Sequence, residues 1–250
     1  MKKQILTAGI ILSLIAIISC SEKKAPEKSA NDNSQVPKSY KVAGSDCNIN
    51  FGNITFNKSI NGADTLVSID GDKISLKVGG EKDYFSDPDE KLSNNTSPIL
   101  LSKIDNTKPF TISAKVTPEF TKQGTYNAGV LFLYSNEGFW EKFCFEQSEG
   151  GEHRMVTVRN RQLSDDNNHD IVEQPFVYMK ISSDTKTIAC YYSLDNQKWQ
   201  MVRLHNNDYP EILYVGISTQ CPVDKAGSSS IFEELSLTNK SVTDFRLGKE

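Results

Sequence analysis

Short segments whose side chains alternate between apolar and polar follow one another from Phe51 onward, with turn residues about every 8–12 residues. This alternation is typical of β-strands, which turn successive side chains to opposite faces. No stretch of the region has the apolar period of a helix. The expected strands are 66–70, 74–78, 98–101, 110–117, 129–134, 139–147, 154–160, 176–182, 187–193, 199–204, 213–218 and 231–237. About a dozen short strands without helices predict an all-β sandwich or barrel.

A targeting segment is expected at the N-terminus. Two lysines precede the apolar run 5–18, which is the arrangement of a signal peptide. As a helix the run would span about 21 Å, too short for the ~30 Å hydrocarbon core of a bilayer. Residues 17–20, Ile-Ile-Ser-Cys, resemble the bacterial lipoprotein signal, in which the cysteine is lipidated. We expect a signal peptide over 1–19 and an exported protein anchored at the bacterial cell envelope, on the outer membrane or cell surface, through lipidated Cys20.

The rest of the chain divides into a tether and one domain. Residues 20–46 are polar, and a segment that buries so little cannot offset its ordering entropy, so we expect a flexible, disordered tether. No Pro/Gly/Ser-rich break divides residues 47–250, which we expect to form a single β-sandwich domain. The formal net charge of −4 argues against a nucleic-acid partner, because such binding needs clustered Lys and Arg.

The alternation is clearest over residues 139–147. The odd positions supply three phenylalanines, and the even positions supply Trp140, Lys142 and Glu146. We expect the phenylalanine face to be core and the even face to carry an aromatic ring beside two charges. Such a face suits a shallow saccharide or peptide site. A large apolar side chain such as tryptophan is costly to expose to water, so an exposed one favours a binding site.

The strand expected at 154–160 extends this candidate face. Val156 and Val158 are expected in the core, so Arg159 and Arg161 would point outward, near Glu146. Phe85, in a polar break of the pattern, is a weaker aromatic candidate. The candidate ligand-binding residues are therefore Phe85, Trp140, Lys142, Glu146, Arg159 and Arg161. The alternative is a solvated sheet face whose cross-strand charge pairs contribute a few tenths of a kcal/mol each.

An acidic segment follows at Ser164–Asp170, where we expect a loop. Its oxygen-rich Asp165, Asp166 and Asn167 are candidate ligands for a hard cation such as calcium, although the D-x-[DN]-x-[DN]-G pattern is absent. The alternative is a solvated loop without a metal. The three histidines are far apart in sequence and are also expected in loops. No other cofactor is expected.

Four cysteines remain once Cys20 is lipidated: Cys47, Cys144, Cys190 and Cys221. An exported chain permits disulfides, and four thiols allow three pairings. Cys144 and Cys190 lie within expected strands, where a small buried thiol is a normal occupant. We therefore expect at most one bridge.

No catalytic residue is predicted. Concanavalin A-like glycosidases typically place their carboxylates on one strand as E-x-D-x-E, and this run is absent. Glu146 is the only carboxylate on its face of the strand, so a catalytic pair would need a residue from elsewhere, such as Asp165. No G-x-S-x-G, Gly-rich phosphate loop or H-E-x-x-H motif occurs.

Several motifs resemble, in order and spacing, the family known as domain of unknown function 1349, also called regulation-of-enolase-like. The matching segments are DYFSDP at 83–88, FTISAKV at 110–116, YNAGVL at 126–131, WEKFCFE at 140–146, RQLSDDN at 161–167 and YSLDNQKW at 192–199. The resemblance covers about residues 49–240. It implies a concanavalin A-like jelly roll of two antiparallel sheets, one of them concave, a shape that often binds or cleaves glycans. The N-terminal lipoprotein signal and tether depart from the family pattern.

Three functions follow from these observations. The first is a non-catalytic module that binds a polysaccharide or glycan and is held to the membrane by its lipid anchor. The second is a glycoside hydrolase or lyase of an unrecognised type. The third is an accessory or structural lipoprotein that binds a protein partner through a flat apolar patch.

Overall fold

A computed structural model describes residues 41–249 of the chain. The expected signal peptide, the lipidation site Cys20 and most of the expected tether lie outside these residues. Within 41–249, no helix is long and apolar enough to cross a membrane.

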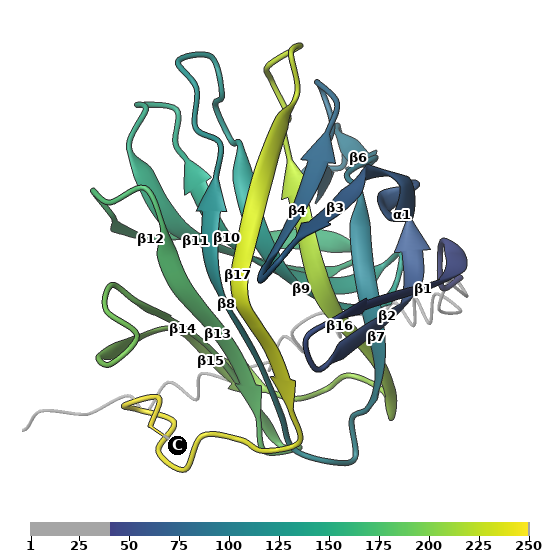
Figure 1. Ribbon diagram of the computed structural model, residues 1–250, viewed down its shortest axis with the longest axis vertical. Coiled ribbons are helices and arrows are strands. Elements are labelled where there is room, and N and C mark those ends of the chain that lie inside the picture. The colour runs from purple at the N-terminus through teal and green to yellow at the C-terminus, as the bar shows by residue number, and fades with distance from the viewer. Residues whose placement is uncertain (1–40, 250) are drawn as a thin grey trace, which may run out of the picture. The chain divides into compact units, whose positions relative to one another are not determined.

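Two large antiparallel sheets form most of the described part of the chain (Figure 1). The eight-stranded sheet contains, in spatial order, β1 (Ser45–Phe51), β2 (Ile54–Ile60), β7 (Ile99–Asp105), β16 (Ile212–Gln220), β9 (Ala128–Asn136), β10 (Phe139–Gln147), β11 (His153–Arg161) and β12 (Leu163–Ile171). The seven-stranded sheet contains β15 (Trp199–Asn206), β14 (Thr187–Ser193), β13 (Val177–Ser183), β8 (Phe110–Pro118), β17 (Ser228–Thr238), β4 (Lys73–Val78) and β3 (Val67–Asp70). Every segment expected to be a strand overlaps one of these strands, so the all-β sandwich is confirmed.

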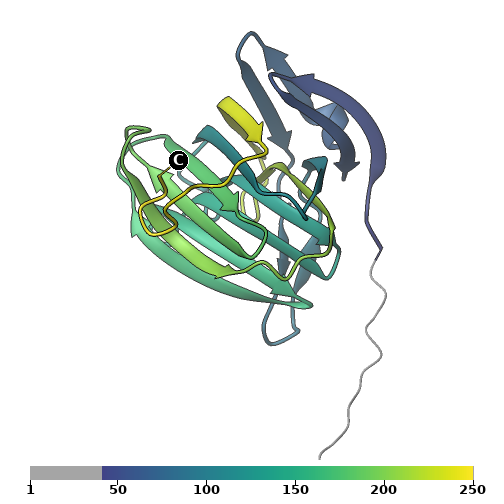
Figure 2. The same cartoon turned by 90° about the horizontal axis from the view of Figure 1, so that it is seen from below.

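Two short elements complete the fold. The hairpin of β5 (Tyr84–Ser86) and β6 (Ser93–Asn95) forms a separate two-stranded sheet. The helix α1 (Ala63–Leu66) has only four residues. After β17 the chain crosses the outer side of the seven-stranded sheet (yellow in Figure 2), where Val242 and Phe245 pack near Tyr191.

The main core lies between the two sheets. Phe143 and Phe145 of β10 are fully buried there, together with Leu131 and Leu133 of β9 and Ile112 of β8. The expectation that the phenylalanine face of 139–147 is core is confirmed. Burial of such side chains supplies most of the driving force for folding, about 1.5–3 kcal/mol for each large apolar group.

A second apolar cluster covers the opposite face of the eight-stranded sheet. Trp140 is 1 % exposed and lies under Tyr84 of β5, whose ring meets the tryptophan edge-on at 5.2 Å between centroids. Phe132 and Tyr134 of β9 belong to the same cluster. The expectation of an exposed Trp140 is therefore wrong, because the β5–β6 hairpin adds a cover that the alternation of 139–147 does not reveal.

The orientation expected for β11 is also wrong. Phe145 is paired with Met155, and Glu141 with Arg159, so Met155 and Arg159 face the space between the sheets. Val156 and Val158 therefore face the other way, into the second cluster. Both faces of this strand are largely buried. Apolar residues therefore occur on both faces, and they do not show which face lies between the two sheets.

The acidic segment expected to be a loop is the strand β12. It pairs with β11 from Arg161 opposite Leu163 to Arg154 opposite Ile171 and forms one edge of its sheet. Asp and Asn are poor strand formers, but tertiary pairing overrides that weak preference. Polar residues also suit an edge strand, because they discourage pairing with another chain. All three histidines likewise lie in strands.

The four described cysteines are free thiols. Cys144 and Cys190 are fully buried, on opposite sides of the eight-stranded sheet. Burial raises the pKa of both thiols well above the usual value, so neither is a ready nucleophile.

Candidate functional site

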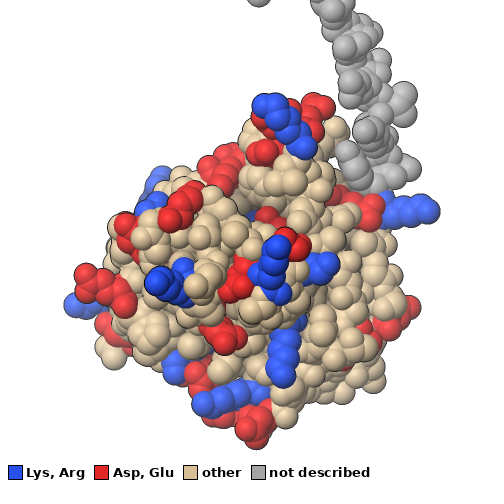
Figure 3. Space-filling view, turned by 90° about the horizontal axis from the view of Figure 1, so that it is seen from above, with Lys and Arg blue, Asp and Glu red and all other residues tan. Residues whose placement is uncertain are grey.

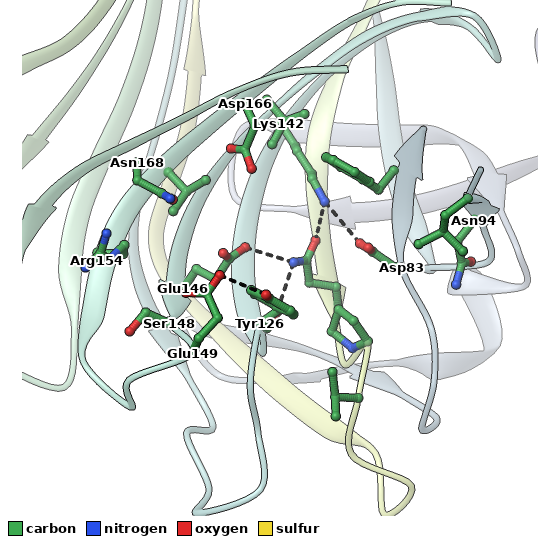
Figure 4. A pocket seen from close by; sticks show the side chains of 17 residues that line it. Asp83, Asn94, Tyr126, Lys142, Glu146, Ser148, Glu149, Arg154, Asp166 and Asn168 are labelled. Atoms are coloured by element: carbon green, nitrogen blue, oxygen red, sulfur yellow. Dashed lines mark hydrogen bonds and ion pairs between the residues drawn. The ribbon is translucent and has the colours of Figure 1, made fainter. Parts of the chain in front are cut away.

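A cavity of about 400 Å³ opens on the face of the eight-stranded sheet that points away from the other sheet (Figure 4). Its floor consists of β10, β11, β12 and the end of β16. Its walls are the β5–β6 hairpin and the segments that follow β10 and β16. The apolar cluster around Trp140 continues the same sheet face. We call this cavity the sheet pocket.

Strand alternation brings the floor residues together. Lys142 of β10 lies opposite Val158 of β11, which lies opposite Asp166 of β12. Asn168 lies two residues beyond Asp166 and shares its face, as Glu146 shares the face of Lys142. Hydrogen-bonded registry across three strands thus aims four polar side chains into one cavity.

Gln220, the last residue of β16, connects the buried charges of the pocket (dashed lines in Figure 4). Lys142 Nζ donates to Gln220 Oε1 at 2.9 Å and to Asp83 Oδ1 at 3.0 Å. Gln220 Nε2 donates to Glu146 Oε2 at 3.0 Å and to the carbonyl oxygen of Tyr126 at 2.9 Å. Lys142 and Glu146 are only 3 % and 8 % exposed.

The electrostatic balance makes Glu146 a weak acid. Burial raises its pKa, the charge of Lys142 lowers it, and Asp166 and Asp83 raise it further, to about 8. Burial lowers the pKa of Lys142, but the neighbouring Asp83 outweighs this effect, and the pKa lies above its usual value. Burial also raises the pKa of Asp166. At neutral pH the pocket therefore holds an ammonium group and a largely protonated carboxyl group.

The rim of the pocket combines a polar side and an apolar side. Tyr126 adopts a left-handed backbone conformation with φ of 65°, and its hydroxyl donates to Glu149 Oε1 at 2.8 Å. Leu92 and Val223 are 54 % and 52 % exposed at the other side, near Phe85. A left-handed tyrosine is a strained feature of the kind that gathers at functional sites. The pocket can therefore contact both an apolar surface and hydroxyl groups of a ligand.

The structure places three of the six candidate residues in the sheet pocket: Phe85, Lys142 and Glu146. The Lys142 Nζ lies 5.6 Å from the centre of the Phe85 ring. Trp140 does not line the cavity, because it lies under Tyr84. The pocket residues that the alternation missed include Asp83, Tyr126, Arg154 and Gln220.

Arg159 and Arg161 lie on the opposite face of the sheet, and their expected place beside Glu146 is wrong. Both guanidinium groups pair with Asp208, and Arg161 stacks on the Phe139 ring at 3.3 Å. Arg159 also lies 3.5 Å from Glu141. The two arginines thus hold the segment between β15 and β16 against this face of the eight-stranded sheet.

Glu141 is the centre of this second polar cluster, which the sequence did not reveal. Its carboxylate is fully buried, 2.9 Å from Nε2 of His205 on the facing sheet. Burial raises the pKa of Glu141, but the hydrogen bond and charge of His205, with the charge of Arg159, hold it below its usual value. Glu141 occupies the phenylalanine face of 139–147, so an isolated charge on an apolar face was the available signal.

The three candidate calcium ligands do not converge. Asp166 faces the sheet pocket, whereas Asp165 and Asn167, one residue away on either side, face the other way. Asp165 pairs with Arg203 at 2.6 Å. Over residues 41–249, no group of three or more His, Cys, Asp or Glu side chains is arranged to hold a metal ion. These three candidates therefore do not form one metal site, because the segment is a strand and not a loop.

Solved structures of similar fold include a functionally unknown protein from Saccharomyces cerevisiae, with 18 % identity and a TM-score of 0.65 over 73 % of this chain and 95 % of that one. The GH43B protein of a Bacteroides ovatus xyloglucan locus has 13 % identity and a TM-score of 0.54 over 75 % of this chain. The GH43 protein BlXynB of Bacillus licheniformis has 13 % identity and a TM-score of 0.52 over 67 %. The match spans only 37 % and 33 % of these two longer chains. At such identities the likenesses show a shared fold.

No curated protein matches the chain. The model of one protein family matches residues 60–240, which is well over half of the chain, and it includes all the elements that form the sheet pocket. The resemblance to this family is confirmed, and so is the sandwich of two antiparallel sheets that it implies. The chain belongs to the family described as protein of unknown function DUF1349.

Proposed function

We propose that the protein binds a glycan in the sheet pocket, without cleaving it. The observation that supports this function is the combination of an apolar rim and a buried hydrogen-bonding floor in one cavity. A volume of about 400 Å³ falls within the roughly 300–1,000 Å³ of small-molecule sites. Sugar rings carry both an apolar face and hydroxyl groups, so they match both parts of the cavity.

Two further observations favour a saccharide over other ligands. Several chains of similar fold carry the name of a polysaccharide, including a xylan β-1,4-xylosidase and the protein of the xyloglucan locus. The face in Figure 3 shows acidic and basic side chains interspersed, without a basic stripe of the kind that nucleic acids require.

The membrane anchor at Cys20 belongs to the same proposal: the domain would be displayed at the bacterial cell envelope.

A glycan-array screen tests this function. The protein carries Cys20→Ser, so that it can be purified without a lipid, and it is compared with a Leu92→Ser/Val223→Ser variant of the pocket rim. We expect the parent to bind a defined set of glycans and the rim variant to lose at least tenfold in affinity. The control is Leu194→Ser/Ile212→Ser, which changes equally exposed apolar residues that do not line the pocket and should bind normally. Equal losses in both variants would contradict the assignment of the pocket.

A glycoside hydrolase or lyase is the second candidate function. It is favoured by the raised pKa of Glu146, because a general acid must hold its proton near neutral pH. A second catalytic carboxyl group could come from Asp166 of β12. The strand registry, however, aligns Asp166 with Lys142 and not with Glu146. Release of reducing ends from the glycans that bind would support this second function, and intact glycans after prolonged incubation would support simple binding.

A further inference from the structure

We infer that Glu146 presents a carboxylic acid proton to the sheet pocket from its Oε1 atom, and that the site therefore takes neutral polyhydroxy sugars in preference to acidic ones. This inference deepens the proposed glycan-binding function and depends on it for the class of ligand. Which oxygen of Glu146 carries the proton is decided by the hydrogen bonds of the pocket alone and does not depend on the ligand.

The orientation of the Gln220 amide is fixed by the chemistry of its partners. The ammonium group of Lys142 can only donate, so the group 2.9 Å from it must be the amide oxygen. The carbonyl oxygen of Tyr126 can only accept, so the group 2.9 Å from it must be the amide nitrogen. The reversed amide would place a donor against a donor and an acceptor against an acceptor.

This orientation decides which oxygen of Glu146 can hold a proton. Gln220 Nε2 uses one N–H for Tyr126 and the other for Glu146 Oε2 at 3.0 Å. Oε2 therefore accepts, and because the unprotonated oxygen of a carboxylic acid is the better acceptor, this bond favours the proton on Oε1. In the described part of the chain no hydrogen bond reaches the other oxygen, Oε1, so a proton there is free to meet a ligand in the cavity.

The surroundings of Glu146 favour the protonated form. The carboxyl group is 8 % exposed, and the amide of Gln220 separates it from Lys142, which is already paired with Asp83. Charged and titratable groups face it from every neighbouring element: Lys142 and Cys144 from β10, Arg154 from β11, Asp166 from β12, and Asp83, Tyr126 and Glu149 from the adjoining segments. Burial and the carboxylates of Asp166, Asp83 and Glu149 outweigh the charge of Lys142 and raise the pKa of Glu146 to about 8.

The resulting pattern of donors and acceptors selects the ligand. A protonated Glu146 offers an O–H donor, and Asp166 across the floor offers acceptor oxygens. A sugar hydroxyl both donates and accepts, so neighbouring hydroxyls of a neutral sugar can satisfy both groups. A uronic acid would bring its carboxylate near Glu149 and Asp166, which repel it, against the guanidinium of Arg154, while the ammonium group of Lys142 is already paired with Asp83.

The Glu146→Gln variant distinguishes a proton donor at this position from a side chain that only supports the structure of the pocket. The glutamine oxygen can accept from Gln220, and its amide nitrogen takes the place of the protonated Oε1 and donates at every pH. We expect the parent protein to bind xylohexaose or cellohexaose at pH 6 and to lose roughly tenfold or more in affinity by pH 10. The glutamine variant should bind equally at both pH values. Glu137→Gln, at the exposed turn between β9 and β10, is the matched control and should behave like the parent.

Carbon-13 NMR of the ligand-free protein measures the proton directly. We expect the Glu146 carboxyl signal, identified by its absence in Glu146→Gln, to titrate with a midpoint near 8. A midpoint near the ordinary value of about 4.3 would overturn the inference, whatever the protein binds.

The binding experiment has distinct outcomes for the inference and for the function. Unchanged parent affinity from pH 6 to 10, loss of binding by Glu146→Gln at pH 6, or tighter binding of hexagalacturonate than of the neutral sugars would overturn the inference and leave glycan binding intact. Binding of none of these sugars, together with an empty glycan array, would overturn the function and the ligand class, while the NMR titration would still decide the protonation of Glu146.

Discussion

Among single residues, Glu146 links the pocket to pH most directly. Its pKa is raised to about 8 in the folded protein, so between about pH 4.5 and 8 the folded state binds more protons than the unfolded state. The free energy of unfolding therefore falls as the pH rises through that window, by up to about 5 kcal/mol from this group. Glu146→Gln should remove this contribution. Urea unfolding of parent and variant at pH 5 and pH 9 checks it, and a stability difference that does not change with pH would contradict it.

Trp140 and the core phenylalanines should behave alike. Trp140 is 1 % exposed and Phe143 is fully buried, although they lie on opposite faces of β10. We expect Trp140→Ala and Phe143→Ala each to lower the free energy of unfolding by about 3–5 kcal/mol. Leu92→Ala at the exposed rim should change it by less than about 0.5 kcal/mol. Chemical unfolding of the three variants provides the measurement, and a loss below about 1 kcal/mol for Trp140→Ala would show that its ring is not part of a core.

The sequence predicted the position of some single residues of the site. Alternation correctly put Lys142 and Glu146 on the face opposite Phe143 and Phe145. It failed for Arg159, because β11 has valines on one buried face and a methionine on the other, so apolar character does not distinguish the two. Long-range partners such as Gln220 could not be found, since pairing of β16 with β9 is not visible in local patterns.

At the scale of elements, the Glu141 cluster joins the two sheets. Glu141 belongs to β10, and its partner His205 belongs to β15 of the facing sheet. Glu141→Ala would leave His205 and Arg159 facing each other without the carboxylate, and we expect a loss of about 3–5 kcal/mol in stability. Glu173→Ala, at an exposed position outside the cluster, should have little effect. Thermal or chemical unfolding checks this, and equal stability of both variants would contradict a structural role for the cluster.

Two elements explain most of the errors in the predicted site. The β5–β6 hairpin covers Trp140, but its residues interrupt the strand pattern and gave no signal of where they would pack. The strand β12 is so polar that its composition indicates a loop, and only its ladder with β11 makes it a strand. Both cases show tertiary contacts deciding what local sequence leaves open.

At the scale of the whole molecule, the fold was the most predictable feature. Periodic alternation is repeated in a dozen segments, so an error in one segment does not change the class of architecture. The pocket depends instead on single contacts between distant segments, such as the bond from Lys142 to Asp83. For that reason, the residues that line the pocket could not be predicted from the sequence.

The proposed membrane anchor is tested by one substitution. Cys20→Ser removes the thiol that would carry the lipid, so we expect the protein to move from the membrane fraction to the soluble fraction. The β-sheet signal in circular dichroism should be unchanged, because the folded strands begin only at Ser45. Retention of the variant in the membrane fraction, with a folded domain, would refute lipidation at this residue.

If a glycan occupies the sheet pocket, the backbone amide NMR signals of the residues around the pocket shift when the glycan is added. The Cys20→Ser protein is titrated at pH 6 with a neutral oligosaccharide from the array. We expect shifts concentrated at the pocket segments, 83–94, 142–149, 154–158, 166–168 and 220–223. Shifts confined to the seven-stranded sheet, or none at saturating sugar, would contradict it.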